Sequence, residues 1–268
     1  MQSIGYGIIM PVYCGVHLLL SPTALGDPSQ LQKSVRPRDD LALSTLPWSI
    51  LWGYILPATM MSLPWFSPKV HQYLVAVWQV FPVWIVALQY LFSKTSRFFL
   101  SPQQRTPKTT EICAINFKCL NQVYHFAFTL ATLTHFITLG LIAWAQWFPT
   151  MISKSDGYAV TFQEVFLPSN FRTRARISDM VQGAHNFFQY DQYVGSMAAI
   201  IWAMTLRCNI RNEVMSTRQW AQLAFEIFGY IMVAGPTGAL VMVLWTRDIQ
   251  VTEARVHMHE MRKASSRP

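Results

Sequence analysis

Apolar runs close to 20 residues long recur along this chain of 268 residues. A helix of about 20 apolar residues is long enough to cross the hydrocarbon core of a bilayer. Polar connections rich in charge, proline and glycine separate these runs, so the pattern predicts helices joined by loops. We predict six membrane-spanning helices, over residues 5–20, 46–66, 70–92, 123–148, 190–206 and 220–245.

The predicted fold is therefore all-α, a polytopic integral membrane bundle forming one transmembrane domain over residues 1–247, with a basic tail over residues 248–268. A seventh span is expected if the apolar patch VTFQEVFLP, residues 160–168, inserts into the membrane. Four spans hold an internal proline: Pro11, Pro57, Pro82 and Pro236. Proline bends a helix and frees a backbone carbonyl. The bent helices either enclose a pocket or reflect the higher frequency of proline in membrane helices.

The charge distribution agrees with a membrane protein. Only 13% of the residues are charged, against about 25% in ordinary soluble domains. The formal net charge is +8, but lysine and arginine lie almost wholly in the connections between apolar runs. Positive charges in that position flank membrane spans, so we expect contact with a lipid bilayer and no nucleic-acid partner.

Two acidic residues, Asp191 and Glu226, lie within or at the edge of an apolar run, and the others are assigned to loops or the tail. An apolar environment disfavours the charged form of a carboxyl group, and a carboxyl group that keeps its proton is a general acid. Phe187 and Phe188 precede Asp191 by about one turn, whereas Glu226 shares a helix face with polar residues such as Tyr230. Both are candidate proton donors.

Each carboxyl group also has a structural interpretation. Glu226 is equally well explained as a hydrogen-bonding group between two helices. Asp191 is explained as a residue at the N-terminus of its own span, where the helix dipole favours a negative charge.

Other side chains are candidates for contact with a substrate. Ten tryptophans, ten tyrosines and seventeen phenylalanines can line an apolar pocket and stabilise a cation through their ring faces. Packing and lipid contact account for most of them. The candidate substrate-binding residues are Trp202, Tyr230, Gln79, His17, Trp52 and Trp78.

The sequence lacks the motifs of several kinds of enzyme chemistry. The sequence contains no HExxH and no CxxC pair, so we expect no metal and no cofactor. It also contains no DDxxD cluster, no GxSxG and no GxGxxG. Diphosphate ionisation by magnesium, serine hydrolysis and nucleotide chemistry are therefore unsupported.

Four segments carry a resemblance to a known family. They are GYGIIMPVYCGVHLLLSPTA, WGYILPATMMSLPWF, HQYLVAVWQVFPVWIVALQ and FFQYDQYVGSMAAIIWA. The chain resembles, from residue 5 to about residue 245, the fungal membrane-bound terpene cyclases of the ascofuranone and macrophorin type. Relatives of this type are longer at the N-terminus, so we expect this chain to lack a helix or to begin at a different start.

The resemblance implies cyclisation of a farnesyl chain attached to an aromatic, polyketide-derived group. The reaction would begin with protonation of an olefin or a terminal epoxide and would need no metal. It implies a multi-pass enzyme of the endoplasmic reticulum in meroterpenoid biosynthesis, an isomerase-type or lyase-type cyclase that works beside other pathway enzymes. Asp191 or Glu226 would give the proton.

Two alternatives from other classes fit the same sequence. A proton-coupled metabolite transporter would use membrane carboxyl groups as coupling sites, although no internal repeat is visible. A non-catalytic membrane scaffold for a biosynthetic pathway is the other.

Overall fold

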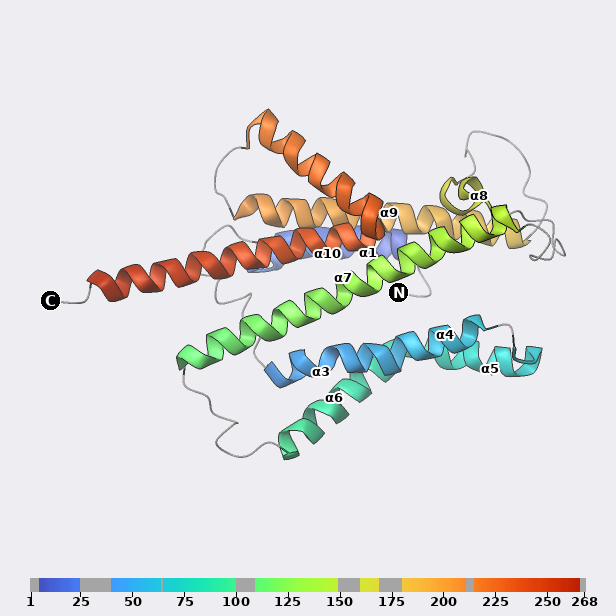
Figure 1. The fold of residues 1–268 in the computed structure, drawn as a ribbon, viewed down its shortest axis with the longest axis horizontal. Coiled ribbons are helices and arrows are strands. Elements are labelled where there is room, and N and C mark those ends of the chain that lie inside the picture. Colours follow the sequence, from blue (N-terminus) through green and yellow to red (C-terminus); the bar gives the residue numbers. More distant parts are fainter. Residues whose placement is uncertain are drawn as a thin grey trace. The chain divides into compact units, whose positions relative to one another are not determined.

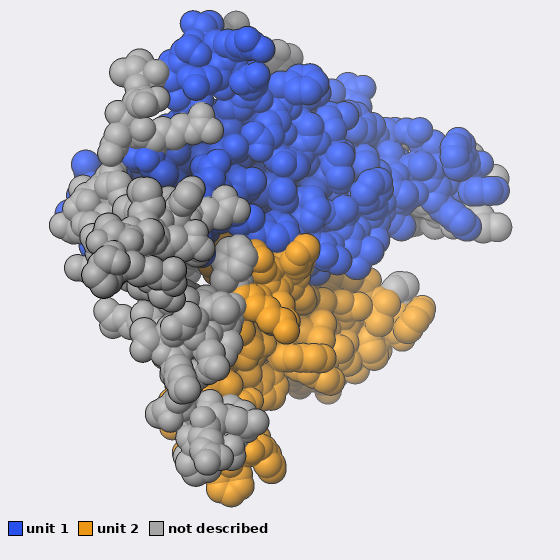
Figure 2. Space-filling view, turned by 60° about the vertical axis from the view of Figure 1, so that its left-hand side comes forward, with its two compact units in different colours: residues 1–33, 127–268 blue, residues 34–126 orange. Residues whose placement is uncertain are grey.

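The computed structural model describes residues 5–24, 40–63, 65–99, 109–148, 160–168, 180–210 and 215–265, and all regular elements in these ranges are helices. The all-α prediction is confirmed for this part of the chain. The chain divides into two compact units, one formed by residues 1–33 and 127–268 and the other by residues 34–126 (Figure 2). We describe each unit by itself.

In the first unit, the long helix α9 (Met180–Asn209) contacts both α1 (Tyr6–Leu20) and α10 (Thr217–Ser265) (Figure 1). The unit also holds α8 (Phe162–Phe166) and α7 (Thr109–Trp147) from residue 127 onward. Small and aliphatic side chains of α9 and α10 form its core: Ala203, Leu223, Ile227, Ala239 and Val243. The small alanine side chains let the two helices approach closely.

Helix α10 is interrupted near its middle at Gly235, whose backbone has φ 69° and ψ 178°. This conformation is essentially restricted to glycine. Pro236 follows and has no N–H to continue the helical hydrogen bonding, so the sequence Gly-Pro divides α10 into two half-helices. The first half ends at the break and the second half runs back from it (Figure 1).

The second unit contains a nearly continuous helix made of α3 (Asp40–Ile50), the π-helical turn η1 (Leu51–Ile55) and α4 (Leu56–Ser62). The π-turn ends two residues before Pro57, which has no N–H for a carbonyl of that turn. Helices α5 (Pro68–Gln79) and α6 (Phe81–Phe99) follow and are bent by 63° relative to each other. Pro82 lies in the first turn of α6 and accounts for this bend.

Polar side chains join α3 to α6 inside the second unit. The fully buried Ser49 hydroxyl donates to Gln89 Oε1 at 2.7 Å, and the Gln89 amide donates to the Ala42 carbonyl. Thr45 and Ser93 hydroxyls lie 3.2 Å apart. In an apolar environment each such group needs a partner, so these bonds fix how the two helices align.

Three helical segments are long and apolar enough to cross a membrane: Leu41–Ser62, Lys118–Trp147 and Thr217–Thr252. The bent pair α5 and α6 adds a fourth if it is one span. Helix α1 is apolar but has only 15 residues, and α9 is not counted among the spans although it has 30. All six predicted segments are helical, but six spans are not confirmed.

Two features differ from the sequence-based predictions. The patch over residues 160–168, which would add a seventh span if it inserted, contains α8, whose five residues rise about 7.5 Å and cannot cross a bilayer. Helix α10 continues to Ser265, so most of the predicted tail is helical. The single domain over residues 1–247 stays a prediction, and the structure is described by its two compact units.

We expect replacement of Gly195 by alanine to loosen α1 from α9. A Cβ atom at Gly195 would lie 2.1 Å from the Tyr6 ring, so the ring must move. Overpacking of this kind costs about 1–3 kcal/mol. Thermal unfolding of the detergent-purified protein measures the loss. Gly15→Ala in α1 is the control, because no neighbouring side chain among the described residues lies within 4 Å of its Cβ position; equal stability of both variants would contradict the prediction.

Candidate functional site

Asp191 lies inside α9 and binds the first turn of α1. Its carboxylate accepts hydrogen bonds from the backbone N–H groups of Tyr6, at 2.9 Å, and Gly7, at 2.7 Å. The first N–H groups of a helix have no partner within the helix, and the helix dipole is positive there. Asp191 therefore caps α1 from a neighbouring helix.

The interpretation of Asp191 as the N-terminal residue of its own helix is wrong. Helix α9 begins at Met180, eleven residues earlier, because the polar and aromatic run before Asp191 is helical too. The glycines of α1 leave room for the carboxylate: a Cβ at Gly5 or Gly7 would lie 2.7 Å or 3.2 Å from Asp191 Oδ1.

The capping bonds leave part of the Asp191 carboxyl group available. A carboxylate has about four lone-pair positions, and the two N–H groups use one on each oxygen. A proton can occupy a remaining position without displacing either bond. The geometry is thus compatible with a carboxyl group that both holds α1 and exchanges a proton.

Glu226 lies at a different place in the same unit. Its Oε1 accepts a hydrogen bond from Arg207 Nη1 at 3.2 Å, which forms an ion pair between α10 and α9. The interpretation of Glu226 as a bonding group between helices is confirmed. Both side chains, with Gln219, Gln222, Leu223, Cys208 and Met215, line a cavity of about 110 Å³.

The two carboxyl groups do not form a pair. Arg207, the partner of Glu226, follows Asp191 by sixteen positions along α9. At 1.5 Å per residue this is about 24 Å along the helix. One carboxyl group therefore cannot assist the other, and each is a separate candidate proton donor.

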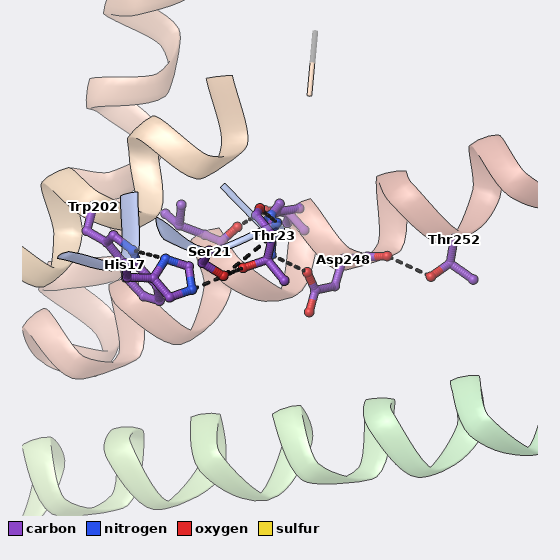
Figure 3. Close-up of polar contacts among 9 residues, drawn as sticks. His17, Ser21, Thr23, Trp202, Asp248 and Thr252 are labelled. Carbon is purple, nitrogen blue, oxygen red and sulfur yellow. Dashed lines mark hydrogen bonds and ion pairs between the residues drawn. The ribbon is translucent and has the colours of Figure 1, made fainter. Parts of the chain in front are cut away.

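The structure brings His17 and Trp202 together, two of the predicted substrate-binding residues (Figure 3). Trp202 Nε1 donates to His17 Nδ1 at 3.1 Å. A nitrogen that accepts a hydrogen bond carries no proton, so His17 is neutral with its proton on Nε2. Nε2 then donates to the Thr23 hydroxyl at 3.0 Å, which lies 2.8 Å from the Ser21 hydroxyl.

The same network contains a buried ion pair that the sequence analysis missed. Arg247 and Asp248 are 5% and 8% exposed, and Arg247 Nη1 donates to Asp248 Oδ1 at 3.1 Å. Arg247 Nη2 donates to the Thr23 carbonyl at 2.6 Å, which ties α10 to the turn after α1. Asp248 was assigned to the tail. The absence of glycine or proline between Trp245 and Asp248 is the signal that the helix continues.

The other predicted substrate-binding residues are dispersed. Tyr230 packs against the core one turn after Glu226. In the second unit, Trp78 stacks on Phe81 at 5.9 Å, and Gln79 is the exposed last residue of α5. Trp52 lines an open cleft of about 290 Å³ with Thr45, Trp48, Phe92, Thr95 and Ser96. Their roles in substrate binding stay predictions.

A metal site is not visible in the part of the chain that the structure describes: no three His, Cys, Asp or Glu side chains gather there in a way that holds an ion. The expectation that catalysis needs no metal stays a prediction.

Sequence comparison assigns the chain to a family. The sequence model described as the CtvD domain matches residues 1–252. The chain belongs to the CtvD-domain family. No solved structure matches it significantly.

Curated relatives of the chain carry consistent names. Terpene cyclase ascI of Acremonium egyptiacum is 29% identical over 91% of this chain and 60% of its own length. Terpene cyclase ctvD of Aspergillus terreus is 25% identical over 91% of this chain and 64% of its own length. Terpene cyclase atmA of Aspergillus flavus is 23% identical over 92% and 64%. The chain thus spans less than two thirds of the relatives that it matches.

Proposed function

We propose that this CtvD-family protein is a membrane-bound terpene cyclase of meroterpenoid biosynthesis. The observation that carries the proposal is the family match over residues 1–252, with relatives named terpene cyclase. The apolar helices support a membrane location. The substrate is a farnesyl chain on an aromatic group, and the enzyme works in the endoplasmic reticulum beside the enzymes that make and modify this compound.

The reaction proposed is an acid-initiated cyclisation without a metal. An acid protonates a terminal olefin or an epoxide, which creates a cation, and neighbouring double bonds attack it in turn. A buried carboxylic acid is suited to the first step, and aromatic faces stabilise the cation.

Asp191 is the proton donor that we favour over Glu226. Glu226 is engaged by a full positive charge on Arg207, and an acid held in an ion pair must give up that partner to take a proton. Among the described residues, the hydrogen bonds to Asp191 come from the neutral N–H groups of Tyr6 and Gly7, and each oxygen keeps a further lone-pair position. Phe187 and Phe188 of the same helix supply apolar and aromatic surface close to it.

An assay in sealed microsomal vesicles separates this function from its rivals. Vesicles that contain the full chain receive a linear farnesylated phenol, and its terminal epoxide in a parallel sample. A cyclase converts one of them to a cyclic isomer, as judged by mass spectrometry and NMR. Movement of unchanged compound across the membrane would instead indicate a transporter, and neither conversion nor movement would indicate a scaffold.

A further inference from the structure

The break in α10 creates irregular backbone within a candidate membrane span. Gly235 lies where α10 turns back (Figure 1), 18 residues after the start and 17 before the end of the apolar segment Thr217–Thr252. Unpaired backbone groups at membrane depth are costly and occur where the backbone lines a protein interior or a binding site. The carbonyls that end the first half-helix carry the negative end of its dipole, which attracts a cation.

His135 of α7 faces this break. Its Nδ1 atom lies 3.2 Å from the position that a Cβ of Gly235 would take, so the missing side chain makes room for the imidazole ring. Within the described residues His135 has ring contacts but no hydrogen-bond partner. It lies 17 residues after the start and 12 before the end of the span Lys118–Trp147. An ionisable residue at that depth without a partner indicates a functional site.

Helix α8 places an aromatic ring at the side of the same imidazole. The Phe166 ring centre lies 6.5 Å from that of His135, and Phe162 packs on Phe166 at 4.8 Å. Gln189 donates to the Glu164 carbonyl at 2.7 Å and the Tyr193 hydroxyl donates to the Phe166 carbonyl. These two residues of α9 lie on either side of Asp191 in the sequence, so the contacts that hold α8 come from the region of the favoured proton donor.

We propose that His135 is the base that ends the cyclisation, an inference that rests on the proposed function. The C–H bond next to the final cationic carbon breaks, its electron pair forms a C=C bond, and the proton moves to the imidazole of His135. A neutral imidazole has one ring nitrogen that can accept a proton, which suits this role. The proton returns through solvent to the donor carboxylate, so the product is an isomer of the substrate.

The experiment compares wild type, His135→Gln and His135→Phe in microsomes with the substrate that the wild-type chain converts. We expect the olefinic product per folded protein to fall by about 10²-fold or more in both variants. Cyclised alcohols, heavier by one water, should replace it, because water then captures the cation. His185→Gln, at an exposed position of α9, is the control with the wild-type product.

The outcomes separate the two proposals. Formation of the wild-type product at the wild-type rate by His135→Gln or by His135→Phe would overturn the role of His135 alone. Size-exclusion chromatography of each variant provides the amount of folded protein for this comparison. If the wild-type chain converts neither substrate, the proposed function itself is contradicted, and the role of His135 falls with it.

Discussion

Replacement of Asp191 by asparagine is expected to lower cyclisation by about 10²–10⁴-fold, the usual contribution of a general acid. Asparagine keeps one side-chain oxygen for the first turn of α1 but has no proton of suitable acidity. The capping bonds to Tyr6 and Gly7 join residues 185 and 184 positions apart in the sequence, so part of the fold depends on this side chain as well. Turnover in microsomes, divided by the amount of folded protein, measures the chemical part.

Glu226→Gln is the matched comparison. It removes a carboxyl group whose partner, Arg207, lies about 24 Å from Asp191 along α9. The new amide still accepts a hydrogen bond from Arg207. We expect turnover close to wild type. Full turnover in Asp191→Asn together with its loss in Glu226→Gln would transfer the role of donor to Glu226.

Replacement of Arg247 by leucine is expected to destabilise the first unit by about 3–5 kcal/mol, the cost of removing one partner from a buried ion pair. Arg247 and Asp248 side chains are only 6% and 11% exposed. The variant leaves the Asp248 carboxylate without its ion pair and the Thr23 carbonyl without its donor. A lower midpoint of thermal unfolding in detergent is the measurement.

The double variant Arg247→Leu with Asp248→Leu provides the control for this prediction. Replacing both charges with apolar side chains also removes the Asp248 charge that Arg247 no longer offsets, and such replacements are often neutral or stabilising. We expect the double variant to recover much of the stability lost by Arg247→Leu. If Arg247→Leu alone is as stable as wild type, the stabilising role of the Arg247–Asp248 ion pair is contradicted.

The helices were predictable because their signal is local. The length and hydrophobicity of each apolar run can be read from that run alone, and all six predicted segments are helical. The bend at Pro82 and the break at Pro236 lie at two of the four prolines identified in the sequence. Proline also lies inside α1, where the helix continues through Pro11, so a proline alone does not determine whether a helix breaks.

The contacts of the candidate site were not predictable in the same way. Asp191 was singled out because a carboxyl group beside an apolar run is costly, but its partners lie at the other end of the chain. The His17–Trp202 bond joins residues 185 positions apart. Without an observed contact, a local pattern shows that a polar group needs a partner and does not show which one. The predicted transmembrane domain ends at Arg247 and the predicted tail begins at Asp248, because charge after an apolar run normally marks its end.

The most direct measurement incubates microsomes that contain the full chain in D₂O, with the linear farnesylated phenol in one sample and its terminal epoxide in another. Each sample is run with and without excess EDTA. An acid-initiated, metal-free cyclisation of the olefin predicts a cyclic product with one carbon-bound deuterium from solvent. With the epoxide the deuterium enters an exchangeable hydroxyl group, and the product in ordinary water has the mass of the substrate. Unchanged phenol and unchanged epoxide would contradict the proposed cyclisation. Conversion that occurs without EDTA and stops in its presence would contradict a metal-free reaction.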